Sequence, residues 1–220
     1  MMKLILIRHA EVDFEWPKKC SSREFDDACK RYDAAGIRTD GVKPAKGKGY
    51  CIITSSQDRA KETARLMFGK APVIESDLFD EVPLVSFRDT EKRLPKWLFD
   101  VMGRLQWLFG SERQPESRRQ TIDRAKKAVA LIDRQGSDCV VISHGFFMRS
   151  LLRVYARGKG YTVTRSTYFT IPPLSRIRIT MAKDHCGNCA HNCLLENPGC
   201  QIGRMKAQQR SAGWKKGSYQ

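Results

Sequence analysis

An α/β fold with a mostly parallel central sheet is predicted by three short apolar segments, each of which leads through polar residues towards a helix. Apolar residues run without interruption from Leu4 to Ile7, and similar segments occupy residues 50–55 and 138–143. Runs of this kind are typical of strands that are buried on both faces inside a parallel sheet. The helical spacing of the segments between them predicts the helices that would cover such a sheet.

The remaining elements follow from helical or alternating spacing along the chain. We expect helices at residues 23–35, 57–68, 93–110, 116–134 and 146–157, a third strand at 72–75, and edge strands at 161–170 and 174–182. Gly36 and Gly136 are plausible terminators of two of these helices. Residues 12–19 form a loop at the mouth of the expected site. Trp16 in this loop either lines a substrate pocket or covers the core.

Chemically active side chains stand where the predicted strands end. The chain has four histidines, and two of them, His9 and His144, occupy matching strand ends. Ligand sites of open α/β sheets form at the carboxyl ends of the strands. One such histidine is usually a structural, hydrogen-bonded residue, but two histidines with Arg8 and Arg59 are hard to explain by packing. Arg59 in a first helical turn opposes the helix dipole, which favours a role in sharing an anion with that helix N-terminus.

Three motifs carry a family resemblance. They are Leu6-Ile7-Arg8-His9-Ala10-Glu11, the segment 54–64 (TSSQDRAKETA), and Ser143-His144-Gly145. In order, spacing and strand-end setting they resemble the histidine phosphatase superfamily (phosphoglycerate-mutase-like) over about residues 1–182. The resemblance implies a three-layer α/β/α fold with a helical cap insertion at about residues 84–117. The family usually has glycine where this chain has Ala10, and alanine is still small enough for a close approach.

The resemblance also implies a role for each site residue. His9 would attack phosphorus and become phosphohistidine, while Arg8 and Arg59 would clamp the phosphoryl group. His144 would stabilise charge on the equatorial oxygens. Glu81 would protonate the leaving oxygen and then activate water, with Asp80 as the competing candidate for this position. No metal or other cofactor is needed for this scheme.

The predicted function is therefore hydrolysis of a phosphate monoester, on a phosphorylated small molecule or a phosphoprotein. A phosphomutase is an alternative, although the chain is short beside mutases, which favours hydrolysis. A second alternative is a regulatory protein with a phosphatase-like fold, whose cysteine-rich, basic tail recruits a nucleic acid or a protein partner. The substrate and the oligomeric state stay open.

The composition changes at the C-terminal end of the chain. Residues 183–202 hold four clustered cysteines with the spacing C-x2-C-x3-C-x6-C, namely Cys186, Cys189, Cys193 and Cys200. Four close thiols in a cytosolic chain predict a tetrahedral metal site, with structural zinc favoured over an iron–sulfur cluster. His185 or His191 could replace one thiol. Residues 203–220 are basic and polar and are expected to form a flexible tail.

Length and net charge limit the number of domains and the classes of ligand that the protein can bind. The 220 residues suit one domain with a small appendage, and the 40 basic and 24 acidic residues give a formal net charge of +16. This charge favours anionic ligands, but the basic residues are spread along the chain, so nucleic-acid binding is not favoured. The apolar runs are too short for a membrane span or a signal peptide, which predicts a cytoplasmic protein with reduced cysteines.

Overall fold

The computed structural model describes residues 3–45, 47, 49–159, 162–163 and 176–180. The chain divides into two compact units, Met1–Thr180 and Met181–Gln220, and every described residue belongs to the first. The four clustered cysteines and the basic segment 203–220 lie outside the described residues.

A six-stranded sheet confirms the predicted α/β fold. Its strand order is β4 (Val73–Glu75), β3 (Cys51–Thr54), β6 (Cys139–Ser143), β1 (Lys3–Arg8), β8 (Arg176–Thr180) and β7 (Thr162–Val163). The first four strands are parallel to one another. The last two join in antiparallel pairing, β8 against β1 and β7 against β8.

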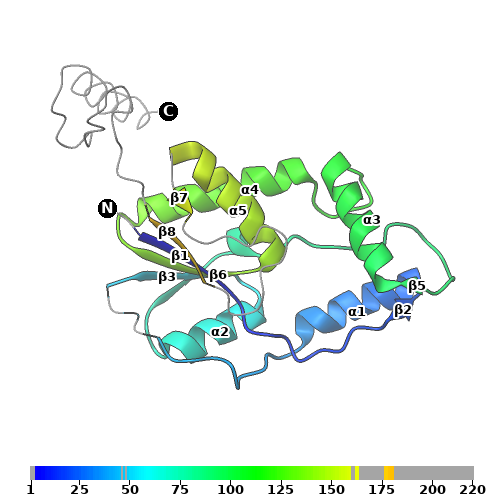
Figure 1. Ribbon diagram of the computed structural model, residues 1–220, viewed down its shortest axis with the longest axis horizontal. Coiled ribbons are helices and arrows are strands. Elements are labelled where there is room, and N and C mark those ends of the chain that lie inside the picture. Colours follow the sequence, from blue (N-terminus) through cyan, green and yellow to red (C-terminus); the bar gives the residue numbers. More distant parts are fainter. Residues whose placement is uncertain (1–2, 46, 48, 160–161, 164–175, 181–220) are drawn as a thin grey trace, which may run out of the picture. The chain divides into compact units, whose positions relative to one another are not determined.

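Helices cover both faces of this sheet. Helices α4 (Arg118–Arg134) and α5 (Gly145–Lys159) lie on one face, and α2 (Asp58–Phe68) lies on the other (Figure 1). Successive side chains of a strand point to opposite faces. In β1, Leu4 and Leu6 accordingly pack into the cluster with α4 and α5, whereas Ile7 packs with α2. This two-sided burial explains why the strand segments are apolar throughout.

A third apolar cluster, which we call the α1–α3 cluster, lies apart from the sheet. It joins α1 (Ser22–Ala34) to α3 (Lys96–Phe109) around Cys20, Phe25 and Phe99, and the Phe25 and Phe99 rings stack with centroids 4.8 Å apart. Trp16 packs against this cluster, so it covers apolar side chains.

Two predicted elements differ from the structure. The helix expected at 93–110 begins only at Lys96, because β5 (Leu94–Pro95) pairs antiparallel with β2 (Lys19–Cys20). The strand expected at the sheet edge near 174–182 is instead β8, which lies between β1 and β7. Strand β8 is internal because it hydrogen-bonds to neighbours on both sides. Of the strand expected at 161–170, the structure describes only β7.

Local sequence signals account for the starts of two helices. Ser21 with Glu24 forms a capping box at α1, and Ser117 with Gln120 forms another at α4. In each box a serine hydroxyl and an acidic or amide side chain satisfy backbone N–H groups that the helix itself leaves unpaired. The serines thereby define where α1 and α4 begin.

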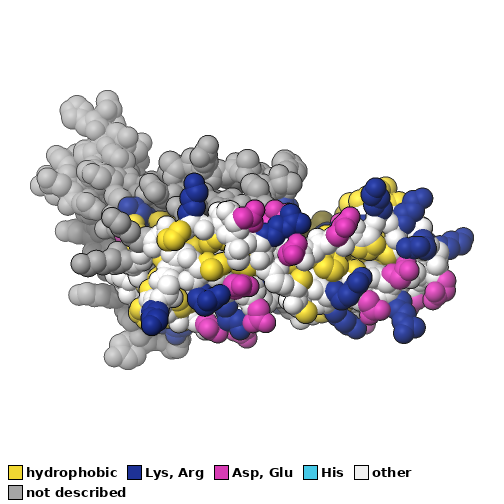
Figure 2. All heavy atoms as spheres, turned by 90° about the horizontal axis from the view of Figure 1, so that it is seen from below, with side chains coloured by type: hydrophobic (Ala, Val, Ile, Leu, Met, Phe, Trp, Pro, Cys, Tyr) yellow, Lys and Arg dark blue, Asp and Glu magenta, His cyan; other side chains and the backbone are white. Residues whose placement is uncertain are grey.

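The surface of the described part of the chain carries both charges. Figure 2 shows lysine and arginine side chains interspersed with aspartate and glutamate side chains over one face of the molecule. No helix among the described residues is both long and apolar enough to cross a membrane.

Candidate active site

The structure brings the strand-end residues of β1, β3 and β6 together at one edge of the sheet. The backbone N–H of His9 donates to the Ser143 carbonyl oxygen at 3.0 Å, which extends the pairing of β1 with β6. The rings of His9 and His144 lie with centroids 4.9 Å apart, and both side chains are buried. The pairing of the predicted histidines therefore follows from the parallel register of two neighbouring strands.

His9 is held as a neutral imidazole in one tautomer. Its Nδ1 donates to the Ala10 carbonyl oxygen at 2.6 Å, since a carbonyl oxygen can only accept. Burial, reinforced by the charges of Arg59 and Arg8, lowers the pKa of His9 to about 3. At neutral pH, Nε2 therefore keeps its lone pair.

Ala10 is tied to helix α2. Its backbone N–H donates to Thr63 Oγ1 at 2.9 Å, and the Thr63 hydroxyl donates to the Arg59 carbonyl oxygen at 2.6 Å. The Ala10 side chain is fully buried, so the small residue fits the contact between strand end and helix. Thr63 thus positions the loop that carries His9, a role that its place on the inner face of a helix did not reveal in the sequence.

The Arg59 side chain is fixed by three partners. Nε donates to His144 Nδ1 at 3.2 Å, Nη1 to Asp33 Oδ1 at 2.8 Å, and Nη2 to Gln57 Oε1 at 2.7 Å. The guanidinium also lies over the Tyr32 ring, 5.2 Å from its centroid. Each terminal nitrogen of an arginine carries a second N–H, so Arg59 keeps donors for an anion while its plane is already oriented.

Arg8 lies between two neighbouring elements. Its guanidinium interacts with the Tyr32 side chain of α1. At the start of α5, a Cβ built on Gly145 would stand 3.3 Å from Arg8 Nε. Burial raises the pKa of Tyr32, so its hydroxyl stays protonated at neutral pH. Tyr32 therefore contacts both arginines from a helix whose sequence spacing indicated only core packing.

Glu81 receives the first amides of helix α5. Its Oε1 accepts from the backbone N–H groups of Phe147 at 2.8 Å and of Val82 at 2.9 Å, and its Oε2 accepts from Phe146 at 3.1 Å. The first N–H groups of a helix lack partners within the helix. Glu81 accepts two of these N–H groups, those of Phe146 and Phe147, in the helix that begins just after His144.

Asp80 has different partners from Glu81. Its Oδ1 accepts from the Ser55 hydroxyl at 2.6 Å and from the Ser56 backbone N–H at 2.8 Å, and its Oδ2 accepts from the Ser56 hydroxyl at 2.6 Å. Ser55 Oγ also lies 2.8 Å from His144 Nε2. The sequence showed hydroxyls at the end of this strand but assigned them no function.

The His144 ring is engaged at both nitrogens, by Arg59 and by Ser55. Burial is the largest cause that holds the pKa of His144 well below its usual value, followed by the neighbouring imidazole of His9 and by the charges of Arg59 and Arg8. The ring is therefore neutral at physiological pH in the free site.

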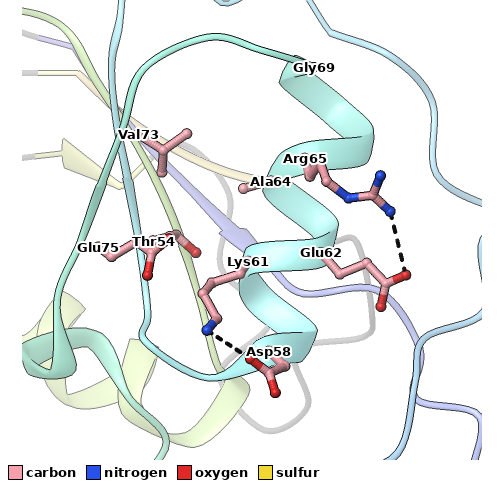
Figure 3. Close-up of a pocket in the computed structure, with 9 residues that line it drawn as sticks. All are labelled: Thr54, Asp58, Lys61, Glu62, Ala64, Arg65, Gly69, Val73 and Glu75. Carbon is pink, nitrogen blue, oxygen red and sulfur yellow. Dashed lines mark ion pairs between the residues drawn. The ribbon is translucent and has the colours of Figure 1, made fainter.

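A separate hollow lies between α2 and strands β3 and β4 (Figure 3). It measures about 420 Å³, and four of its charged side chains form two ion pairs, Lys61 with Asp58 at 2.7 Å and Arg65 with Glu62 at 3.9 Å. None of the predicted site residues lines it. Among the described residues, no three histidine, cysteine or acidic side chains are grouped to hold a metal ion.

The comparisons with known proteins agree with this geometry. The model of the histidine phosphatase superfamily (branch 1) matches residues 4–193. The chain belongs to this superfamily. No curated protein sequence matches it significantly.

Solved structures of the superfamily fold are similar at low sequence identity. Phosphoserine phosphatase from Entamoeba histolytica, as a mutant in complex with phosphoserine, is 19% identical, with a TM-score of 0.53 over 81% of this chain and 90% of that one. The same enzyme in complex with 3-phosphoglyceric acid is 21% identical, with a TM-score of 0.51 over 81% and 90%. The product of an open reading frame of Mycobacterium tuberculosis is 22% identical, with a TM-score of 0.51 over 80% and 90%.

Proposed function

We propose that the protein is a metal-independent phosphatase that hydrolyses a phosphate monoester through a phosphohistidine on His9. The observation that carries this proposal is the state of His9. Its Nδ1 is bound to the Ala10 carbonyl, its pKa is about 3, and the ring lies beside His144 and Arg59. A neutral imidazole whose second nitrogen keeps a lone pair is a nucleophile at physiological pH.

In the first step, Arg8 and Arg59 hold the phosphoryl oxygens through charge-assisted hydrogen bonds. The Nε2 atom of His9 forms a bond to phosphorus while the bond from phosphorus to the ester oxygen breaks. Glu81, in its protonated form, gives a proton to the leaving oxygen.

In the second step, the Glu81 carboxylate takes a proton from water, and the water oxygen attacks phosphorus. The phosphorus–nitrogen bond breaks and returns the electron pair to His9, which releases inorganic phosphate. Both steps depend on positioning and on charge neutralisation, which the arginines and His144 provide. His144 stabilises the equatorial oxygens.

The α1–α3 cluster supports the proposed role of residues 84–117 as a cap that selects the substrate. Helix α3 of this segment packs on α1, and α1 contributes Tyr32 and Asp33, which contact Arg8 and Arg59. A cap joined to the site in this way would select a phosphorylated small molecule or phosphoprotein by the group that carries the phosphate. Phosphoserine and 3-phosphoglycerate, the ligands of the two Entamoeba histolytica structures, are suitable first substrates.

The test is hydrolysis of 4-nitrophenyl phosphate by purified protein in EDTA, beside the His9→Ala variant. We expect turnover that survives the chelator and falls by at least about a thousandfold in the variant, because the variant has no nucleophile. Acid-labile, base-stable phosphate trapped on the wild type would identify phosphohistidine. Equal rates for both proteins would contradict the proposal, and transfer of labelled phosphate to an added alcohol in preference to water would indicate a mutase.

We propose separately that Cys186, Cys189, Cys193 and Cys200 hold a structural zinc ion, on the sequence spacing alone. These residues lie outside the described part of the chain. The four described cysteines are free thiols, and the proposed reaction uses none of them. Removal of bound zinc is therefore expected to leave the chemistry at His9 in place.

A further inference from the structure

Asp80 and Glu81 are neighbours in the chain, yet their carboxylates bind different parts of the site. Glu81 accepts from the first amides of α5, whereas Asp80 accepts from Ser55 and Ser56. We infer that Asp80 is a positioning residue, which acts on His144 through the Ser55 hydroxyl and sets where the His144 proton resides. This inference rests on the proposed phosphohistidine reaction and adds a function for Asp80 to it.

The direction of each hydrogen bond follows from donor chemistry. Arginine Nε can only donate, so His144 Nδ1, 3.2 Å away, must be the acceptor. The proton of the neutral ring is therefore on Nε2, which donates to Ser55 Oγ at 2.8 Å. The Ser55 hydroxyl proton is then available to Asp80 Oδ1 at 2.6 Å. The chain of donors runs from Arg59 through His144 and Ser55 to the Asp80 carboxylate.

Asp80 is itself held in place by the backbone and by Ser56. Besides its two bonds to Ser56, its own carbonyl oxygen accepts from Arg124 Nη1 at 2.8 Å. Arg124 is anchored in turn by Glu116 at 2.8 Å. The carboxylate can therefore orient Ser55, and Ser55 can orient His144, without a flexible link. Such hydrogen-bonded supports fix the tautomer and the ring plane of a functional histidine.

A bound phosphoryl dianion changes the protonation state that His144 must adopt. To donate to a phosphoryl oxygen, Nδ1 must take up a proton, because the Nε2 proton already binds Ser55. The hydrogen bond from Arg59 Nε to Nδ1 must then break, because both atoms would be donors. That proton comes from solvent, and the ring becomes a cation whose charge is opposed by the phosphoryl oxygens and, through Ser55, by Asp80.

The balance of charge around His144 explains why a carboxylate is needed there. The pKa of the ring is lowered first by burial and then by its neighbours, and Asp33 and Glu81 already serve Arg59 and the α5 amides. Asp80 is the carboxylate that reaches the ring through one hydroxyl. The titratable and charged groups facing the ring, in order of effect, are the imidazole of His9 and the cations Arg59, Arg8 and Arg124.

Nuclear magnetic resonance of histidine-¹⁵N-labelled protein tests the inference without turnover. We expect wild-type His144 to show a protonated Nε2 and, when vanadate is bound, a second proton on Nδ1. Asp80→Asn and Ser55→Ala should each shift the Nε2–H signal and lower the pH at which the vanadate complex gains the second proton. Asp77→Asn is the matched control, because it removes the same charge from an exposed position three residues earlier and should change neither signal.

Kinetics separate a positioning residue from the proton donor. With aryl and alkyl phosphates of increasing leaving-group pKa, Asp80→Asn should lower kcat by about tenfold or more, to a similar extent for each substrate. Glu81→Gln should lower kcat by a larger factor as the leaving group becomes more basic, because a more basic leaving oxygen depends more on protonation. Thermal unfolding of each variant identifies a loss of activity that comes from misfolding. Ser55→Ala provides a second test of the same link if Asp80→Asn is unstable.

The outcomes are distinguishable. Unchanged His144 signals in both Asp80→Asn and Ser55→Ala would overturn the inference. A leaving-group dependence in Asp80→Asn like that of Glu81→Gln would also overturn it, since Asp80 would then be the donor. If the wild type turns over no phosphate ester but the signals respond as expected, the proposed function fails while the link from Asp80 to His144 stands.

Discussion

Gly145 lies against Arg8 at the start of helix α5. A Cβ at this position would stand 3.3 Å from Arg8 Nε and 3.5 Å from both Cδ and Cζ, closer than most side-chain contacts in proteins. The side chain that would have to move is that of Arg8, which we propose binds the phosphoryl group. A small residue after the second histidine therefore serves the placement of an arginine on the neighbouring strand.

We predict that Gly145→Ala raises KM for an aryl phosphate several-fold, because Arg8 must move by a few tenths of an ångström from its place. The free energy of unfolding should change little, because the steric cost of moving Arg8 is offset by the better helix propensity of alanine, a gain of up to about 1 kcal/mol. Steady-state kinetics and urea denaturation measure the two effects. Gly36→Ala is the control, because no atom stands within 4 Å of a Cβ there. A KM change of equal size in both variants would contradict the steric explanation.

The buried histidines predict a loss of stability in mild acid. The pKa of His9 in the folded chain is about 3, below the ordinary value of 6.5, and that of His144 is lowered in the same direction. Between these pH values the unfolded chain binds more protons than the folded one, so the free energy of unfolding falls as pH falls. From about pH 7 to pH 5.5, each histidine should contribute a loss of about 1 kcal/mol.

Urea denaturation at the two pH values measures this loss. His9→Asn removes one of the two titrating groups and keeps an N–H that can donate to the Ala10 carbonyl. The variant should therefore show a pH dependence smaller by about 1 kcal/mol over the same interval. An unchanged difference between the two pH values would show that His9 has the same pKa in the folded chain as in the unfolded chain.

At the scale of elements, helix α3 has two faces with different burial. Phe99 is fully buried in the α1–α3 cluster, between Phe25 and Phe87, whereas Phe109 is 82% exposed at the end of the same helix. The amphipathic spacing of the sequence identified the helix but did not identify its partner. One partner is α1, which also presents Tyr32 and Asp33 to the site. Another is α4, whose Thr121 hydroxyl accepts from Trp107 Nε1 at 2.8 Å.

We predict that Phe99→Ala lowers the free energy of unfolding by about 3 kcal/mol or more, because it leaves a cavity in the α1–α3 cluster. Phe109→Ala, the same substitution at the exposed end of the helix, should change it by less than about 0.5 kcal/mol. Urea denaturation of both variants gives the comparison. Similar losses in the two variants would mean that the cluster does not stabilise the fold.

At the scale of the whole molecule, the charge of the chain bears on substrate capture. The formal net charge is +16, while lysines and arginines are interspersed with carboxylates on the face shown in Figure 2. The net charge attracts anions at long range, whereas basic and acidic side chains are mixed on this face of the described part of the chain. The field therefore suits small anionic substrates.

We predict that kcat/KM for a dianionic aryl phosphate falls several-fold as sodium chloride is raised from about 20 mM to about 500 mM, because salt screens the attraction between protein and substrate. The value of kcat should change much less, since we propose that Arg8 and Arg59 contact the bound phosphoryl group directly. Initial rates at a series of substrate concentrations measure both constants. A kcat/KM that is insensitive to salt would show that the net charge does not assist binding.

Local sequence patterns were enough to predict the α/β class, the family and the strand-end positions of His9 and His144. Apolar runs mark the buried strands locally, and the carboxyl ends of parallel strands necessarily meet at one edge of a sheet. The place of β8 within the sheet was not determined in this way, because alternation shows that a strand exists but not how many neighbours it has.

Tertiary packing alone shows which partners the adjacent residues Asp80 and Glu81 take, and that Tyr32 of α1 reaches the arginines. These contacts join segments separated by many residues, and their geometry depends on how η1 (Asp77–Phe79), α1 and α5 are packed. Side chains next to each other in a chain point in different directions once the backbone is fixed. Packing, which no local pattern records, therefore directs one carboxylate to Ser55 and the other to the start of α5.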